Sequence, residues 1–136
     1  MERIVVLKKV FGEEYLRLEL MADDAFINAQ WSGVQSVETV MEGGNKILEM
    51  IKESGCSKLL NSNKNVIGSW DLALEWAENE WAPGVREAGL RYLAQVVPSS
   101  YYAAMTIESL LPRIDGNFEI RTFEEDKDAE AWLLSV

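Results

Sequence analysis

The residues best suited to chemistry in this sequence lie between Asn61 and Glu75. The segment 61–70 reads Asn-Ser-Asn-Lys-Asn-Val-Ile-Gly-Ser-Trp and follows the apolar pair Leu59-Leu60. Its asparagines, serines and glycine favour a loop that leaves a strand and enters a helix. In α/β proteins such loops are common places for ligands and switches, because helix N-termini present free N–H groups there. The candidate switch or partner-binding residues are Asn61, Ser62, Asn63, Ser69, Trp70, Asp71 and Glu75.

Ser69 is the central residue of this set. It stands where a helix through Trp81 is expected to begin, so its hydroxyl can serve as an N-cap that contributes about 1 kcal/mol. A phosphate on the same hydroxyl would gain from the helix dipole, whereas the nearby carboxylates of Asp71 and Glu75 would repel it. An ordinary helix cap and a regulatory switch are the two interpretations of this serine.

The predicted helix 70–81 combines carboxylates with tryptophans and has no basic residue. Asp71 and Glu75 are one turn apart, a spacing that suits an acid–base pair or a divalent cation. A metal ion needs more ligands than these two carboxylates supply. A solvated acidic face, or one that binds a basic protein, explains them better, so we expect no catalytic residue, no metal site and no cofactor.

Aromatic and sulfur-containing side chains raise a second possibility, an apolar pocket between helices. Its candidate residues are Trp76, Trp81, Tyr101, Tyr102 and Met105, and core packing is the alternative for each of them. A carrier of an apolar or lipid-like small molecule in a cleft lined by these side chains is therefore an alternative function.

Composition excludes several function classes. The chain has no histidine and one cysteine, Cys56, so it lacks the usual general base, a disulfide framework and a thiolate metal site. The net charge of −10 argues against nucleic acid and favours a neutral or basic protein partner. No stretch approaches the ~18 apolar residues of a membrane span. Because the sequence also starts without a signal-peptide pattern, we expect a cytoplasmic protein.

Hydrophobic periodicity predicts a single α/β domain with the order β-β-β-α-β-α-β-α-β-α. The first three strands form an antiparallel meander, and β-α-β crossovers with about four helices complete a mixed sheet. The strand at 3–8 has a free edge that is able to pair across a homodimer. The predicted strands cover 3–9, 15–20, 26–31, 58–60, 91–97 and 118–123. The first predicted helix is 36–53, with Ser36 as cap and Gly55 as stop. The second runs from Ser69 to Trp81, and Pro83-Gly84 separates it from one more turn at 85–90. The third is 99–111, stopped by Pro112, and a terminal helix is opened by a Thr122–Glu125 capping box.

Three short motifs accompany this order of elements. They are Phe123-Glu124-Glu125 with Ala129 and Trp132-Leu133, Gly68-Ser69-Trp70 with Trp76, and residues 89–94, Gly-Leu-Arg-Tyr-Leu-Ala. With them the chain resembles the STAS domain group, the anti-sigma-factor-antagonist-like proteins and their SpoIIAA-like relatives.

The resemblance implies a SpoIIAA-like fold and a non-enzymatic regulatory or protein-interaction module. In family members that act as phospho-switches, a serine at this strand-to-helix turn is phosphorylated and controls docking to a kinase or an anti-sigma factor. Ser69 is the nearest positional match, and Ser62 is the second. The family's usual Asp-Ser-Ser/Thr-Gly order is absent here, because Gly68 precedes Ser69.

Overall fold

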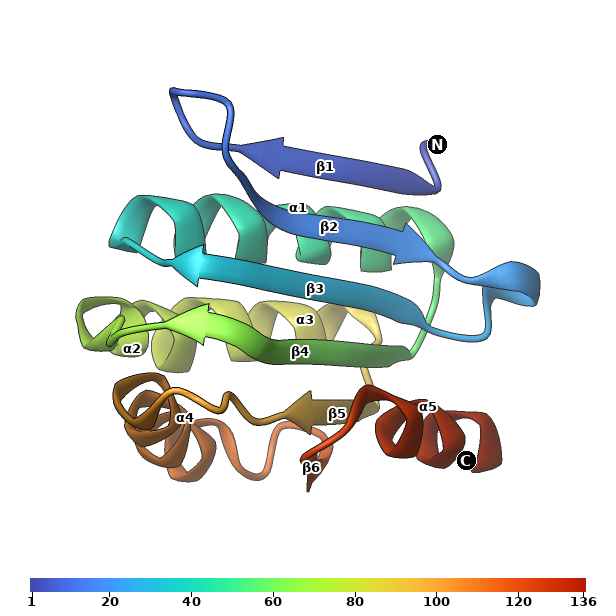
Figure 1. The fold of residues 1–136 in the computed structure, drawn as a ribbon. Coiled ribbons are helices and arrows are strands. Elements are labelled where there is room, and N and C mark those ends of the chain that lie inside the picture. The colour runs from blue at the N-terminus through green and yellow to red at the C-terminus, as the bar shows by residue number, and fades with distance from the viewer.

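The chain folds around one six-stranded sheet whose strands lie side by side in sequence order (Figure 1). The computed structural model describes residues 1–136. The first three strands pair antiparallel and the remaining neighbours pair parallel. The mixed sheet predicted from the sequence is therefore confirmed. The strands are β1 (Ile4–Lys8), β2 (Glu14–Leu20), β3 (Ile27–Val34), β4 (Lys58–Ile67), β5 (Tyr92–Val96) and β6 (Glu119–Phe123).

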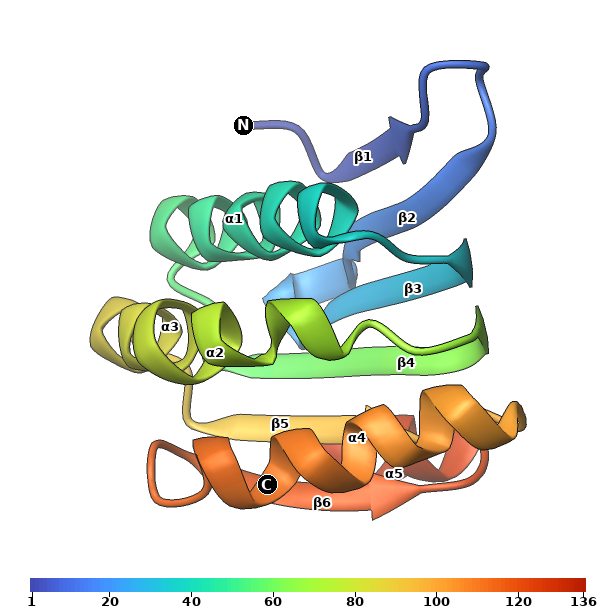
Figure 2. The ribbon, with the colours of Figure 1, turned by 90° about the vertical axis from the view of Figure 1, so that its left-hand side faces the viewer.

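Helices cover both faces of the sheet. Figure 1 shows α1 and α3 behind the sheet and α5 in front of it. Right-handed crossovers between successive parallel strands place their helices on one face, and Figure 2 shows α1, α3 and α4 together there. Helix α5 packs on the opposite face, against β4, β5 and β6. The helical segments are a 3-10 turn (Ala22–Asp24), α1 (Val37–Ser54), a second 3-10 turn (Asp71–Ala73), α2 (Leu74–Trp76), a π-helical turn (Ala77–Trp81), α3 (Ala82–Ala88), α4 (Tyr101–Ile114) and α5 (Asp126–Ser135).

Helix α1 has the ends that its sequence predicts. The Ser36 hydroxyl accepts a hydrogen bond from the Thr39 N–H at 3.1 Å, and the Thr39 hydroxyl accepts one from the Ser36 N–H at 2.9 Å. Gly55 ends the helix in the left-handed conformation, with φ of 72°. Both signals are local, which explains why the sequence reveals them.

The loop predicted over residues 61–70 is wrong for residues 61–67, which extend β4. Beside β3, Ser62 pairs with Gln30 and Asn65 pairs with Ser32, so two residues of β4 lie opposite one residue of β3. This irregularity lengthens the strand without breaking it. Buried hydrogen-bond partners for the polar side chains make the extended strand stable.

The predicted interruption at Pro83-Gly84 is also wrong, because residues 71–88 form a continuous helical segment. The Ala82 N–H donates to the Ala77 carbonyl, which makes a π-turn directly before Pro83. A widened turn accommodates a proline ring that would clash with the carbonyl four residues earlier in a regular α-helix.

Two other predicted helix ends differ from the structure. Pro112 lies inside α4, which continues to Ile114, because a proline in the last turn removes only one hydrogen bond. The capping box predicted for Thr122 and Glu125 is absent. Glu125 occupies the N-cap position of α5, and its carboxylate pairs with Lys64 of β4 instead of capping the helix.

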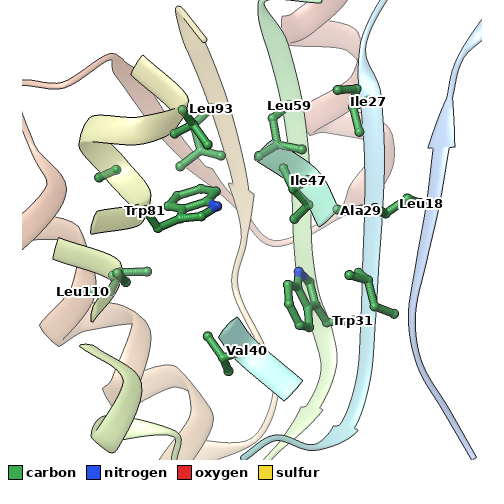
Figure 3. Close-up of a cluster of buried hydrophobic side chains, with 14 of the residues drawn as sticks. Leu18, Ile27, Ala29, Trp31, Val40, Ile47, Leu59, Trp81, Leu93 and Leu110 are labelled. Atoms are coloured by element: carbon green, nitrogen blue, oxygen red, sulfur yellow. The ribbon is translucent and has the colours of Figure 1, made fainter. Parts of the chain in front are cut away.

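The main hydrophobic core lies between the sheet and the helices α1, α3 and α4. Figure 3 shows part of it, with Leu18, Ala29 and Leu59 on strands facing Ile47 of α1. A smaller cluster lies under α5 and includes Phe26, Leu60, Ala94, Trp132 and Leu133.

Tyr15 of β2 makes the unfolding free energy depend on alkaline pH. Its side chain is 1% exposed and its hydroxyl donates to Glu42 at 3.0 Å. Burial, then the hydrogen bond to Glu42 and the charge of that carboxylate, raise the pKa of Tyr15 far above its usual value near 10. The stabilisation is complete below about pH 10 and is lost as pH rises toward the folded-state pKa, because only the unfolded tyrosine then ionises.

We therefore expect the unfolding free energy of the wild type to fall with pH more steeply than that of Tyr15→Phe above about pH 10. The difference between the two slopes should reach up to roughly 1.4 kcal/mol per pH unit. Urea unfolding between pH 9 and 11 measures the difference. If the unfolding free energies of the two proteins change in parallel with pH, Tyr15 has the same pKa in the folded and unfolded states and this account is contradicted.

Candidate functional site

A cavity of about 50 Å³ lies between the sheet and the helices that cover it. Four tryptophans from three segments line it, Trp31 of β3, Trp70 at the turn after β4, and Trp76 and Trp81 of the helical segment 71–88. No charged side chain reaches it. In Figure 3 the lining side chains of Trp31, Val40, Trp81 and Leu110 approach one another from β3, α1, the π-turn and α4.

Asn61 and Asn63 of β4 form the polar side of the cavity. The Asn61 amide donates to Gln95 Oε1 at 2.9 Å, and the Gln95 amide donates to Asn63 Oδ1 at 2.6 Å. Trp31 Nε1 donates to Asn61 Oδ1 at 2.8 Å. These bonds connect β3, β4 and β5 on the face of the sheet that α1, α3 and α4 cover. They explain how a run of asparagines can lie inside a buried strand.

Two hydrogen-bond donors at the cavity have no partner in the chain. The indole N–H of Trp70 is fully buried and makes no hydrogen bond. The Asn63 side chain accepts through Oδ1, but its amide nitrogen donates to no protein atom. Since buried polar groups are nearly always paired, the unpaired Trp70 indole N–H distinguishes the cavity from an ordinary packing defect.

Gly44 of α1 allows two of the tryptophans to approach the helix backbone. A Cβ atom at this position would lie 2.7 Å from a Trp76 ring atom and 3.1 Å from a Trp81 ring atom. The Trp81 indole also donates to the Gly44 carbonyl at 3.0 Å. Close approach of the neighbouring helical segment therefore accounts for Gly44.

Ser69 is exposed at the turn between β4 and the following helix. Its hydroxyl accepts from the Asp71 N–H at 3.3 Å and lies 3.3 Å from the buried Thr106 hydroxyl of α4. Thr106 also lies 2.9 Å from Asp71 Oδ1. The predicted N-cap role of Ser69 is incorrect. Trp70 occupies that position, without a side-chain cap, and Ser69 closes a short side-chain turn one residue earlier.

The remaining candidate residues of the 61–75 segment separate into different environments. Ser62 is buried on the opposite face of the sheet, where its hydroxyl donates to Asp126 at 2.8 Å, so a kinase cannot reach it. Asp71 and Glu75 are exposed, and no three acidic or cysteine side chains come together as a metal site. Burial raises the pKa of the Cys56 thiol, which keeps this cysteine unreactive.

The five candidates for an apolar pocket are not brought together. Trp76 and Trp81 line the cavity, whereas Tyr101, Tyr102 and Met105 are exposed on α4. The structure adds Trp31, Gln35, Gln95 and Thr106, which the sequence analysis did not single out. The alternation along 26–31 indicates that Trp31 faces the core, but no sequence signal pointed to the other three.

Two segments that meet at Ser69 carry large exposed apolar side chains. Besides the contact of Thr106 with Ser69, the Gly68 N–H donates to the Ser100 hydroxyl at 3.4 Å, which fixes the start of α4 beside the turn. Figure 2 shows the end of β4 and the start of α4 at the same end of the molecule. The exposed side chains, called the turn patch below, are Ile67, Leu72, Tyr101, Tyr102 and Met105.

Comparison with protein-family models, curated protein sequences and solved structures finds no match for this chain. None of its helices combines the length and the apolar character required to cross a bilayer.

Proposed function

We propose that this chain is a non-enzymatic regulatory or protein-interaction module of the STAS-like type, which binds a partner protein through the turn patch. The main observation in support of this proposal is that the five large apolar side chains of the turn patch are exposed, Leu72 to 88% and Tyr101 to 70%. Large exposed apolar side chains are common at protein interfaces, and aromatic residues often dominate the binding energy there. The STAS-like assignment is supported by the order of elements and by a serine at the turn after β4.

The surroundings of the patch favour a neutral or basic partner. Asp71 and Glu75 are exposed beside it, and the chain as a whole carries a net charge of −10. Complementary basic residues on the partner would steer encounter and suppress wrong pairings. No cofactor takes part in this proposal.

Ser69 is the regulatory residue in this proposal. A phosphate would add about −1.5 to −2 charge beside Asp71 and would disturb the contact with Thr106. Since Thr106 belongs to α4, the modification would alter the relative position of the two segments that form the turn patch.

Co-purification from the source cells with quantitative mass spectrometry tests the proposal. We expect wild type to enrich a defined partner and Leu72→Glu to lose it by about thirtyfold, the effect of removing one interface hot spot. Leu134→Glu is the matched control, because Leu134 is 59% exposed on α5, on the other side of the sheet. Equal enrichment by the two variants would contradict the patch. Identical partner lists for Ser69→Ala, Ser69→Asp and wild type would contradict the switch.

Two further parts of the proposal concern the state of the protein in the cell. A cytoplasmic location is consistent with a single, buried cysteine and hence no disulfide within the chain. A homodimer is supported by β1, an edge strand whose outer backbone groups have no neighbouring strand. Light scattering on the purified sample reports the mass of the assembly.

A further inference from the structure

We propose that the tryptophan cavity is a binding site for a small neutral molecule that carries a hydrogen-bond acceptor, such as a carbonyl oxygen. The proposal rests on the lining of the cavity and is independent of the turn patch. It names a site and a ligand class that differ from a lipid carrier, since a cavity of about 50 Å³ is too small for an acyl chain.

The lining determines the charge and shape of the ligand. With no ionised side chain at the cavity, a charged molecule would lose its hydration and gain no counter-charge. Indole faces from Trp31, Trp70, Trp76 and Trp81 offer apolar surfaces that suit a compact ring. A single water needs about 10–15 Å³ of such volume, so the space admits several waters or one small organic molecule.

The free donors determine the polar group of the ligand. Trp70 is 9% exposed, and its buried N–H has no acceptor. The Asn63 amide nitrogen is the second free donor, while Asn61 and Gln95 are already engaged with one another. The buried Trp70 indole N–H, together with the Asn63 amide, favours a molecule that accepts hydrogen bonds, in the way typical of mostly apolar ligand sites with a few polar groups.

A groove of about 280 Å³ lies next to the cavity and gives a route into it. Gln35 and Trp70 line both spaces, and Ser69 and Asp71 line the groove alone. The backbone N–H of Trp70, distinct from its indole N–H, donates to the Thr106 hydroxyl at 3.4 Å.

The test uses three five-membered-ring probes of nearly equal size with the ¹⁵N-labelled protein. 2-Pyrrolidinone has a neutral carbonyl, pyrrolidine is a cation at neutral pH, and cyclopentane has no polar group. We expect 2-pyrrolidinone to bind saturably and to shift the Trp70 indole resonance downfield as the N–H gains an acceptor. Cyclopentane is expected to bind about three- to tenfold more weakly, the range of one net hydrogen bond, and pyrrolidine not to bind.

Trp70→Phe removes the N–H and keeps an aromatic ring, and we expect it to weaken 2-pyrrolidinone binding by about three- to tenfold. Trp132→Phe is the matched control, because Trp132 belongs to α5 and is buried against the opposite face of the sheet. Its affinity should equal that of the wild type.

Three results would overturn the proposal. The first is that 2-pyrrolidinone causes no saturable shift of any cavity indole resonance, which would mean that the cavity holds water only. The second is that 2-pyrrolidinone and cyclopentane bind with equal affinity. The third is that wild type and Trp70→Phe bind 2-pyrrolidinone with equal affinity. The comparison of probes uses the unaltered protein, so it decides the matter even if a variant fails to fold. None of these results bears on partner binding through Leu72, which keeps the two proposals distinguishable.

Discussion

Gln95→Leu is expected to lower the free energy of unfolding by about 3 kcal/mol, because it leaves the Asn61 amide and Asn63 Oδ1 with only the long bond of 3.4 Å between them. Gln95 is completely buried on β5, and its side chain accepts from Asn61 and donates to Asn63. Leucine has a similar size but can satisfy neither amide. The loss therefore reflects the cost of unpaired polar groups and not a cavity.

Urea unfolding followed by tryptophan fluorescence measures this change. Gln30→Leu is the control, since Gln30 is a half-buried glutamine that bonds Asn28 and Asp126 on the other face of the sheet. Solvent can reach those partners, so we expect a change within about 1 kcal/mol. If Gln95→Leu proves as stable as Gln30→Leu, the buried amide network is not what stabilises the end of β4.

Gly43→Ala is expected to destabilise the fold by about 2–3 kcal/mol through overpacking. An added Cβ would lie 2.4 Å from a Trp31 ring atom and 2.8 Å from Leu16 Cδ2, both in the core. A displaced Trp31 would also lose its hydrogen bond to Asn61. These costs outweigh the gain of about 1 kcal/mol that alanine brings to a helix.

The same substitution at Gly84 provides the comparison. The nearest atom to a Cβ there is a Leu48 methyl carbon at 3.5 Å, an ordinary contact. We therefore expect Gly84→Ala to be neutral or to stabilise the protein by up to about 1 kcal/mol. Thermal or urea unfolding of both variants tests this, and a Gly43→Ala protein no less stable than Gly84→Ala would contradict the packing described for Trp31.

The sequence predicts those parts of the fold that depend on neighbouring residues. Alternation along β2 and β3 and the Ser36 and Gly55 signals of α1 act within a few positions, so the mixed sheet and this helix are correctly predicted. The continuous segment 71–88 is not, because its π-turn depends on how Trp76 and Trp81 pack against Gly44 and not only on Pro83.

The candidate site is harder to predict because distant residues complete it. Asparagines at 61 and 63 indicate a loop until Gln95, more than thirty positions later, provides their partners. Ser62 likewise looks like a loop serine until Asp126 of α5 accepts its hydrogen bond. No local pattern indicates that Thr106 of α4 contacts Ser69.

Partner binding through the turn patch is tested most directly by a dissociation constant. The complex to be measured is that of this chain with the partner enriched by the wild type. Isothermal titration calorimetry with purified proteins gives this value for wild type, Leu72→Glu and Leu134→Glu. We predict binding about thirtyfold weaker for Leu72→Glu and unchanged for Leu134→Glu. Equal dissociation constants for all three proteins would contradict a docking surface at the turn patch.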